Sequence, residues 1–247
     1  MGDPSAFFIS SNPVILTIAG LRARFTVNKN EMDTMNAYPK LPLAFYERAD
    51  VFQITRELLG KVLVSKSAEG LTSGMIVEAE AYNGEKDKAA HVYGGKRTKR
   101  TETMYGEAGH AYIYLCYGIH HMLNVVTNKI DIPKAILIRA LEPVDGIELM
   151  MRRRKKKTFD NSLTRGPGSL CQALGIHYRQ DGTALWGDEL WIEDRKITFR
   201  PEKISTGPRI GVDYAAEDAL LPYRFFISGN PFVSKAPKKT EKSQVTF

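Results

Sequence analysis

The chain has 247 residues and carries 35 lysines and arginines against 28 aspartates and glutamates, a formal net charge of +7. This charge favours a polyanionic partner, with nucleic acid ahead of an acidic membrane surface. Two cysteines are too few for a disulfide framework and lack metal-site spacing, so we expect an intracellular location: the cytoplasm or nucleoid of a bacterium, or the nucleus of a eukaryote. No run approaches the ~20 apolar residues that span a membrane.

Composition divides the chain into one domain and two tails. Residues 1–38 do not follow the pattern of the rest, and we expect a disordered N-terminal extension. Residues 39–235 contain no Ser/Pro/Gly-rich linker, which predicts one large domain. Residues 236–247 are polar and predict a frayed C-terminal tail.

The domain is expected to begin with a helix and two strands. Residues 44–59 place apolar side chains at the spacing of an amphipathic helix that ends at Gly60, with Asp50 as the cap of its second part. Residues 61–65 and 74–82 predict two strands joined by a turn, which begin a β-meander.

The second of these strands alternates between an apolar and a polar face. Glu78 and Glu80 share the polar face at a spacing of about 6.6 Å along the strand. One interpretation is a solvent-facing row on a half-exposed strand. The other is the floor of a cleft, because Tyr82 ends the row beside a glycine-containing loop, and such loops often hold functional sites.

Residues 83–103 form a polar loop with two central glycines. It is either a solvated mobile loop or a loop that contacts phosphates, and in the second case four cations are the candidates: Lys96, Arg97, Lys99 and Arg100. Asp87 and His91 are one helical turn apart, but no third ligand is nearby, so no metal site is expected.

Residues 109–127 predict a β-hairpin, because two runs of β-forming residues meet at Tyr117-Gly118. Tyr112 and Tyr114 are two residues apart and therefore share one face. An ordinary hairpin with tyrosines at a wet edge is one interpretation. The alternative is functional, since an aromatic residue on a rigid two-stranded support can be inserted into a stack of bases.

Residues 136–141 predict a short inner strand with Arg139 inside it, closed by Glu142-Pro143. An inner arginine needs a partner, and Glu78 and Glu80 are the candidates. Residues 145–157 begin as a helix and end in six cations, a solvated loop or a DNA-facing one.

The last third of the domain predicts a short helix and several short strands. Residues 166–169 open a short helix over residues 170–174, and this start, with Gly168 and Ser169, either binds a phosphate through free N–H groups or forms a plain cap. The expected strands, which close one curved sheet, are residues 189–193, 209–211 and 223–227.

Six motifs in this order resemble the alkyladenine (3-methyladenine, alkylpurine) DNA glycosylase family, and the resemblance covers about residues 43–235. They are VEAEAY (77–82), AAH (89–91), YIYLCYG (112–118), IRALEP (138–143), GPGSLCQAL (166–174) and RIG (209–211). The resemblance implies a mixed α/β (α+β) fold: a single domain around a curved, mostly antiparallel sheet with flanking helices and a protruding β-hairpin.

The resemblance also implies a function. It is that of a monofunctional enzyme, with no metal or cofactor, that hydrolyses the N-glycosidic bond of alkylated or deaminated purines in double-stranded DNA: the 3-methyladenine, 7-methylguanine, hypoxanthine and ethenoadenine class. The family's general base falls on Glu80, its water-site arginine on Arg139 and its intercalating tyrosine on Tyr117. Its base pocket falls on Tyr82, His91, Tyr114, Asn124 and Leu137. We expect a monomer.

Three positions depart from the family pattern, namely Thr101, Ile119 and Ser169, and they bear on DNA contacts and substrate range. Two other functions compete. A non-catalytic nucleic-acid-binding module would share the basic loops and the tyrosine hairpin, but has no need of Glu80 with Arg139. A formyltransferase-like or tRNA-modifying enzyme would need a cofactor site, and the sequence shows no such motif.

Overall fold

The computed structural model describes residues 14–18, 21–25 and 38–235. The chain divides between Tyr38 and Pro39 into two compact units. In the first unit, β1 (Val14–Ile18) and β2 (Leu21–Phe25) pair antiparallel. The expected disorder of residues 1–38 otherwise falls outside the described residues, as does the C-terminal tail. None of the helices in the described part of the chain has the length and apolar composition needed to cross a bilayer.

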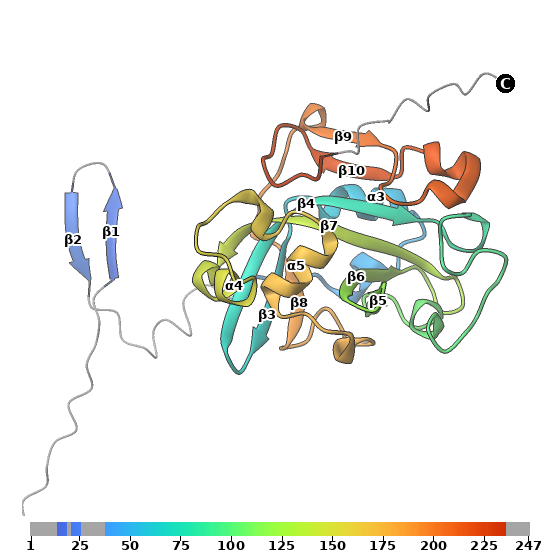
Figure 1. Cartoon of the computed structure of the whole chain (residues 1–247), viewed down its shortest axis with the longest axis horizontal. Coiled ribbons are helices and arrows are strands. Elements are labelled where there is room, and N and C mark those ends of the chain that lie inside the picture. The colour runs from blue at the N-terminus through green and yellow to red at the C-terminus, as the bar shows by residue number, and fades with distance from the viewer. Residues whose placement is uncertain (1–13, 19–20, 26–37, 236–247) are drawn as a thin grey trace, which may run out of the picture. The chain divides into compact units, whose positions relative to one another are not determined.

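The second unit is a mixed α/β fold built on one large open antiparallel sheet (Figure 1), as predicted. The hydrogen-bonded strand order is β5-β6-β7-β4-β10-β9, and β3 pairs with β4 and β8. The strands are β3 (Val62–Ser67), β4 (Gly70–Tyr82), β5 (Ala111–Cys116), β6 (His120–Thr127), β7 (Lys134–Asp145), β8 (Leu190–Glu193), β9 (Ile204–Gly207) and β10 (Arg224–Ile227).

Strand β4 is the centre of this sheet and changes partners along its length. On one edge of β4, the first half pairs with β3, and Glu78 to Glu80 pair with β10. On the other edge, β4 pairs with β7. The pairing with β7 shifts at three points, and the two shifts around Glu78 leave Val77 on one strand and Arg139 on the other without a partner. Such bulges bend strands and redirect side chains. Two of the three shifts lie beside Glu78, where the acidic residues of β4 face β7.

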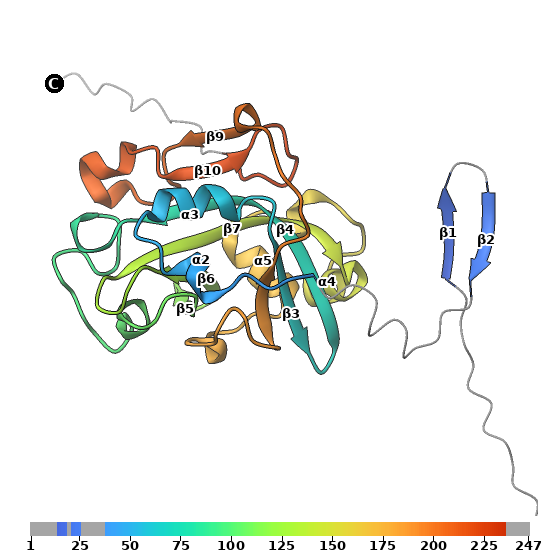
Figure 2. The ribbon, with the colours of Figure 1, turned by 180° about the vertical axis from the view of Figure 1, so that it is seen from behind.

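Helices lie on both sides of the sheet. Helix α3 (Val51–Leu58) and helix α5 (Pro167–Leu174) both contact β4 and β7, and Figures 1 and 2 show them on opposite sides of these strands. Among the described residues, the remaining α-helices are α2 (Leu43–Tyr46) and α4 (Ile147–Arg153), and the short 3-10 segments are η1 (Gly84–Lys86), η2 (Glu102–Tyr105), η3 (Asn161–Leu163), η4 (Tyr178–Gln180), η5 (Pro201–Lys203) and η6 (Asp213–Leu220).

The predicted helix 44–59 is wrong as one element, because the chain forms α2 and α3 with a break between them. Asp50 has an extended backbone, and its carboxylate accepts hydrogen bonds from the amides of Phe52 and Gln53. A helix cap takes non-helical dihedrals, so the predicted cap is confirmed and is also the reason for the break.

Two strand predictions are also corrected. Residues 209–211 form no strand, because the Arg209 guanidinium is buried against Asp87 and holds this segment in a loop after β9. Strand β7 does not close at Glu142-Pro143 but continues to Asp145, with Pro143 opposite Gly74. This end of β7 lacks a second neighbouring strand, since β6 pairs only with residues 134–137, and proline is tolerated at such an edge.

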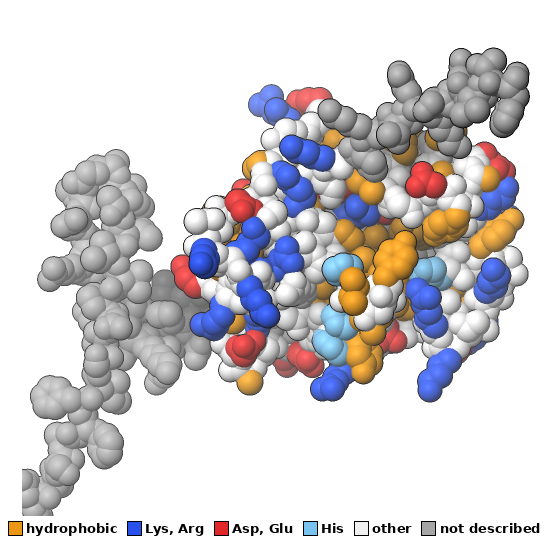
Figure 3. All heavy atoms as spheres, in the orientation of Figure 1, with side chains coloured by type: hydrophobic (Ala, Val, Ile, Leu, Met, Phe, Trp, Pro, Cys, Tyr) orange, Lys and Arg blue, Asp and Glu red, His pale blue; other side chains and the backbone are white. Residues whose placement is uncertain are grey.

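The predicted hairpin is present as β5 and β6, with a tight turn at its tip. Tyr117 and Gly118 both have positive φ, 51° and 72°, and the Ile119 amide donates to the Cys116 carbonyl. Positive φ at both central residues is what a type I′ turn requires. Figure 3 shows an orange ridge of hydrophobic side chains over the hairpin, in the middle of this face of the molecule.

Candidate active site

The floor of the candidate site is a buried acidic row on β4. The side chains of Glu78 and Glu80 are 0% exposed, because β10 and β7 flank this part of the strand. The solvent-facing interpretation of this row is therefore wrong. Arg139, on β7, places Nη1 3.2 Å from Glu80 Oε1 and Nε 3.4 Å from Glu78 Oε1, so the predicted pairing is present.

The two carboxylates differ in their other partners. Glu78 accepts hydrogen bonds from Arg224 Nη1 at 3.0 Å and from the Ser234 amide at 2.8 Å. Glu80 instead accepts from the Tyr82 hydroxyl at 3.0 Å and from the Ile210 amide at 2.8 Å. Tyr82 and Ile210 line an open groove, whereas Arg224 and Ser234 do not. Glu80 is thus the carboxylate whose surroundings reach solvent.

Burial dominates the protonation of Glu80. It raises the pKa of the carboxyl above its ordinary value of 4.5, and the charge of Glu78 raises it further. The Arg139 charge, the Ile210 amide and the Tyr82 hydroxyl lower it, but by less. Arg139 therefore favours the ionised form, as predicted, without restoring an ordinary pKa. A carboxylate with a raised pKa is a stronger general base when it is ionised.

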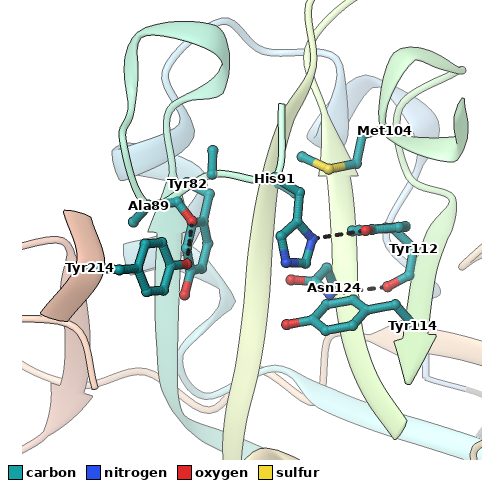
Figure 4. A pocket seen from close by; sticks show the side chains of 10 residues that line it. Tyr82, Ala89, His91, Met104, Tyr112, Tyr114, Asn124 and Tyr214 are labelled. Atoms are coloured by element: carbon teal, nitrogen blue, oxygen red, sulfur yellow. Dashed lines mark hydrogen bonds between the residues drawn. The ribbon is translucent and has the colours of Figure 1, made fainter. Parts of the chain in front are cut away.

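Beside this floor lies an aromatic pocket, called here the inner pocket. Figure 4 shows Tyr82 and Tyr214 on one side of it and His91, Tyr112 and Tyr114 on the other. It is lined by Tyr82, Ala89, Ala90, His91, Met104, Tyr112, Tyr114, Asn124, Ala135 and Tyr214. Strands β4, β5 and β6 and the loop after η1 thus supply the predicted pocket residues, except Leu137.

His91 is held in one orientation and kept neutral. Its Nδ1 lies 2.9 Å from the Tyr112 hydroxyl, and its ring meets Tyr114 edge-on with centroids 4.6 Å apart. Burial lowers the pKa of His91 to about 4, and the charge of Arg100 adds to this shift. The ring is therefore uncharged at neutral pH and presents a polar but neutral edge to the pocket.

The described residues around His91 do not form a metal-binding cluster. Asp87 is committed elsewhere, since its carboxylate forms an ion pair with Arg209 at 2.5 and 2.8 Å. Across residues 38–235, no group of three or more His, Cys, Asp or Glu side chains is arranged to hold a metal ion.

Asn124 is fixed by the hairpin backbone. Its Nδ2 donates to the carbonyls of Tyr112, at 3.1 Å, and Met122, at 3.4 Å. Because the amide nitrogen is used in this way, its oxygen is directed away from the strand, and Figure 4 shows the side chain between His91 and Tyr114. Asn124 is thus a rigid polar group in an otherwise aromatic pocket.

A second cavity, called here the outer groove, continues from the inner pocket to the hairpin tip. It shares Tyr82, His91, Tyr114 and Tyr214 with the pocket and adds, among others, Arg100, Tyr117, Leu137, Arg139 and Ile210. Leu137 lies here beside Arg139 rather than in the inner pocket. Tyr117 is 92% exposed at the end of the groove. The groove therefore joins the exposed tip to the aromatic pocket, and it reaches the acidic row through Tyr82, Arg139 and Ile210, which contact Glu80.

The four cations of residues 96–100 are exposed but not equivalent. Arg97 pairs with Glu102 at 2.6 Å and Asp131 at 2.7 Å. Lys96 and Lys99 have no carboxylate partner in the described part of the chain. Arg100 turns toward the pocket, where its Cζ lies 4.8 Å from the centre of the Tyr114 ring.

Gly168 and Ser169 lie in the first turn of α5, next to the hairpin. A Cβ on Gly168 would approach His120 to 3.1 Å, which shows how closely the helix start packs against β6. Of the departures from the family pattern, Thr101 stabilises its own loop, accepting from the Thr98 amide and donating to the Lys96 carbonyl. Ile119 is 70% exposed beside Tyr117.

Four residues of the site were not among the predicted ones. The sequence did indicate Tyr112, because strand alternation places it on the same face as the predicted Tyr114. Ile210 contacts Glu80 through its backbone amide, which any residue type could supply. Arg224 contacts Glu78, which lies 146 residues away in the sequence. The sequence around these two residues therefore gives no sign of their roles. Tyr214 comes from η6, and nothing in its neighbourhood distinguishes it.

Comparison with known proteins agrees with this geometry. The family model described as Methylpurine-DNA glycosylase (MPG) matches residues 44–231. Proteins named "Putative 3-methyladenine DNA glycosylase" from Bacillus cereus (strain AH820) and Bacillus anthracis (strain A0248) are 49% identical over 203 residues, 78% of this chain and 98% of theirs. One from Bacillus cereus (strain G9842) is 50% identical over 204 residues. The chain belongs to the methylpurine-DNA glycosylase family, enzymes that hydrolyse N-glycosyl bonds in DNA.

Proposed function

We propose that this protein is a monofunctional glycosylase that flips alkylated or deaminated purines out of duplex DNA and releases them with a water molecule activated by Glu80. The observation that carries the proposal is the outer groove, which runs from an exposed tyrosine to an aromatic pocket and is lined by three residues that contact the buried Glu80 carboxylate: Tyr82, Arg139 and Ile210. We expect the 3-methyladenine, 7-methylguanine, hypoxanthine and ethenoadenine class of bases as substrates. The enzyme works as a monomer on double-stranded DNA inside the cell.

Flipping is required because a base within the duplex cannot reach a buried pocket. Enzymes that do chemistry on a base extrude the nucleotide and stabilise it by stacking. Tyr117 would enter the space that the base leaves, and its rigid turn keeps the entropy cost of insertion low. Tyr82, His91 and Tyr114 would then hold the base, since they surround the far end of the same groove.

Glu80 would act as the general base for hydrolysis. It takes a proton from water, the water oxygen bonds to C1′, and the electron pair of the N-glycosidic bond leaves with the base. The sugar gains oxocarbenium character on the way. Arg139 would hold Glu80 and the water in place, because its Nη1 is 3.2 Å from Glu80 Oε1 and it lines the groove. The products are an abasic strand and a free base.

The side chains at the site support a water nucleophile. A bifunctional glycosylase attacks the sugar with an amine of lowered pKa. No lysine lines the inner pocket or the outer groove among the described residues. Water next to Glu80 is then the nucleophile that these cavities offer.

Base selection would follow from the pocket chemistry. A cationic alkylpurine stacks more strongly on tyrosine rings than a neutral base does. His91, neutral at pH 7, adds no charge against such a base. Asn124 is fixed by two backbone carbonyls and would crowd the exocyclic amino group of ordinary guanine, which selects by obstruction. The same contact would oppose 7-methylguanine, but the stronger stacking of this cationic base on the tyrosine rings would offset it.

The competing functions lack support. Membership in a family of N-glycosyl hydrolases argues against both a binding module without activity and a formyltransferase-like or tRNA-modifying enzyme. The buried pair of Glu80 and Arg139 on the groove would also be costly for a module that only binds.

The test is a duplex with one hypoxanthine in a labelled strand. We expect an intact abasic strand that breaks only after alkali, unchanged activity in EDTA and no adduct trapped by borohydride. A trapped adduct that disappears when one lysine is replaced would overturn the water mechanism. Release of no base from hypoxanthine or 3-methyladenine duplexes would overturn the proposed substrate class.

A further inference from the structure

Arg100 occupies the boundary between the inner pocket and the outer groove. Its guanidinium lies over the Tyr114 ring, with Cζ 4.8 Å from the ring centre. Its Nη2 is 3.4 Å from His91 Nε2, and because a guanidinium only donates, this contact makes Nε2 the acceptor of the neutral ring. Arg100 therefore rests on the two residues that the proposed function assigns to holding the base.

This position is unusual among the arginines around the site. Arg97, Arg139, Arg209 and Arg224 each contact at least one carboxylate. Arg100 contacts none within residues 38–235, and its side chain is exposed. An exposed contact between a cation and an aromatic ring is weak compared with a charge-assisted hydrogen bond to a phosphate. The guanidinium is thus held where it is, but only loosely.

The position of Arg100 conflicts with binding of a base. A base stacked on Tyr114 and a guanidinium over the same ring compete for the surface around it, and a cation in this position repels an alkylated purine that carries a positive charge. DNA removes the conflict, because the phosphates beside a flipped nucleotide would enter the groove that Arg100 lines.

We propose that Arg100 is an exchangeable gate on the base pocket. In the free enzyme it lies on Tyr114 and His91 and opposes entry of a free base. On DNA it leaves the ring for a phosphate, and the pocket opens to the flipped base. The gate rests on the proposed function, and it makes the pocket selective for bases delivered by a DNA backbone over bases free in solution.

The experiment compares Arg100→Ala with Lys99→Ala, which removes the same charge from the same loop without a contact to the pocket. Binding of free 1,N6-ethenoadenine is followed by its fluorescence, and binding of undamaged duplex by anisotropy. Loss of the gate should raise the affinity of Arg100→Ala for the free base by about two- to fivefold, the equivalent of one exposed cation–π contact. Its duplex affinity should fall.

Lys99→Ala should bind duplex more weakly and the free base as the unchanged protein does. A role of Arg100 in stability alone would lower both affinities of Arg100→Ala together. An equal or lower affinity of Arg100→Ala for the free base would overturn the gate. Free-base binding that is insensitive to Tyr114→Ser, or absent from every variant, would instead overturn the pocket itself and so the proposed function.

Discussion

The site has a buried half and an exposed half that handle charge in opposite ways. The buried half is the acidic row, in which Glu78, Glu80 and Arg139 are at most 7% exposed and pair with one another. The exposed half is the rim, formed by Tyr117 at the hairpin tip and the cations of residues 96–100. Partners in the row are fixed by the sheet, whereas three of the four rim cations, Lys96, Lys99 and Arg100, have no carboxylate partner among the described residues and are open to exchange.

In the proposed function this difference divides catalysis and DNA binding between the two halves. A fixed, desolvated row suits proton transfer and bond breaking, because its geometry does not change when DNA binds. A solvated rim suits DNA binding and base extrusion, because its cations can trade solvent ions for phosphates. Variants of the row should therefore change the chemical step or stability, and variants of the rim should change affinity or flipping.

The largest effect is expected for Glu80→Gln. Removing a general base costs about 100- to 10,000-fold in rate, equivalent to about 3 to 5.5 kcal/mol of barrier. The amide keeps the size of the side chain, so affinity for lesion-containing duplex should stay within about tenfold. Single-turnover excision of hypoxanthine with saturating enzyme checks this. A near-native rate would transfer the role of base to another group.

Glu78→Gln separates the two members of the row. It leaves Arg224 buried with a weakened partner, and breaking a buried ion pair from one side costs about 3 kcal/mol or more of unfolding free energy. At a pH well above the pKa of Glu80, the folded fraction should keep excision rates close to those of the unchanged protein, because Arg139 still contacts Glu80. The charge of Glu78 raises the pKa of Glu80, so its removal should move the acid limb of the rate profile to lower pH. Urea unfolding measures the cost. Glu142→Gln is the control, because this carboxylate of β7 forms no ion pair with a described residue and accepts only from the Asn230 amide group.

The pH dependence tests how the row controls protonation. In the proposed mechanism the ionised form of Glu80 is the active one, so we expect the rate to be full above its pKa and to fall tenfold per pH unit below it. Burial raises that pKa, which places the acid limb of the single-turnover profile above the range of an ordinary glutamate. Arg139→Gln removes a charge that lowers the pKa and should move the limb to higher pH. A limb that moves down would contradict this.

At the rim, Tyr117→Ser should weaken the flipped complex by about tenfold and leave the chemical step unchanged. The measurement is the fluorescence change when an etheno-base duplex binds. Tyr117→Gly adds a sharper contrast, because φ of 51° costs a tyrosine about 1 kcal/mol, a strain that glycine does not carry. That variant should flip poorly and yet unfold at higher denaturant. Ile119→Ser is the matched exposed control.

Local pattern predicted much of this molecule. The alternation along residues 74–82 correctly placed Glu78 and Glu80 on one face, and the turn signal at Tyr117-Gly118 located the hairpin. Both depend on neighbours in sequence, which is why the sequence shows them.

What failed depends on partners far along the chain. The acidic row is buried because β10 pairs beside it, more than 140 residues later. The strand expected at Arg209 is absent because its guanidinium pairs with Asp87, 122 residues away. Tyr214 is brought to the pocket by η6, and its own segment carries no periodic pattern. Such tertiary contacts override the local propensity of the sequence.

The smallest effect expected at the rim is on the salt dependence of binding to undamaged duplex. Lys96 and Lys99 have no carboxylate partner among the described residues, so replacing both with alanine should lower the slope of log K against log salt by about 1.8, or about 0.9 for each phosphate that is no longer neutralised. Arg97→Ala should change the slope by less than about 0.9, because Glu102 and Asp131 already share its charge. Binding measured at four salt concentrations distinguishes the two variants.

Two outcomes would change this picture of the rim. If the slope falls by the same amount for each cation removed, Arg97 must exchange Glu102 and Asp131 for a phosphate when DNA binds. An unchanged slope in the double variant would move the duplex-binding surface to residues 152–157, where Arg153 and Lys156 are themselves paired, with Glu69 and Asp160. In that second case, the cations of residues 152–157 would also divide into two groups: those paired with carboxylates and those free to contact phosphates.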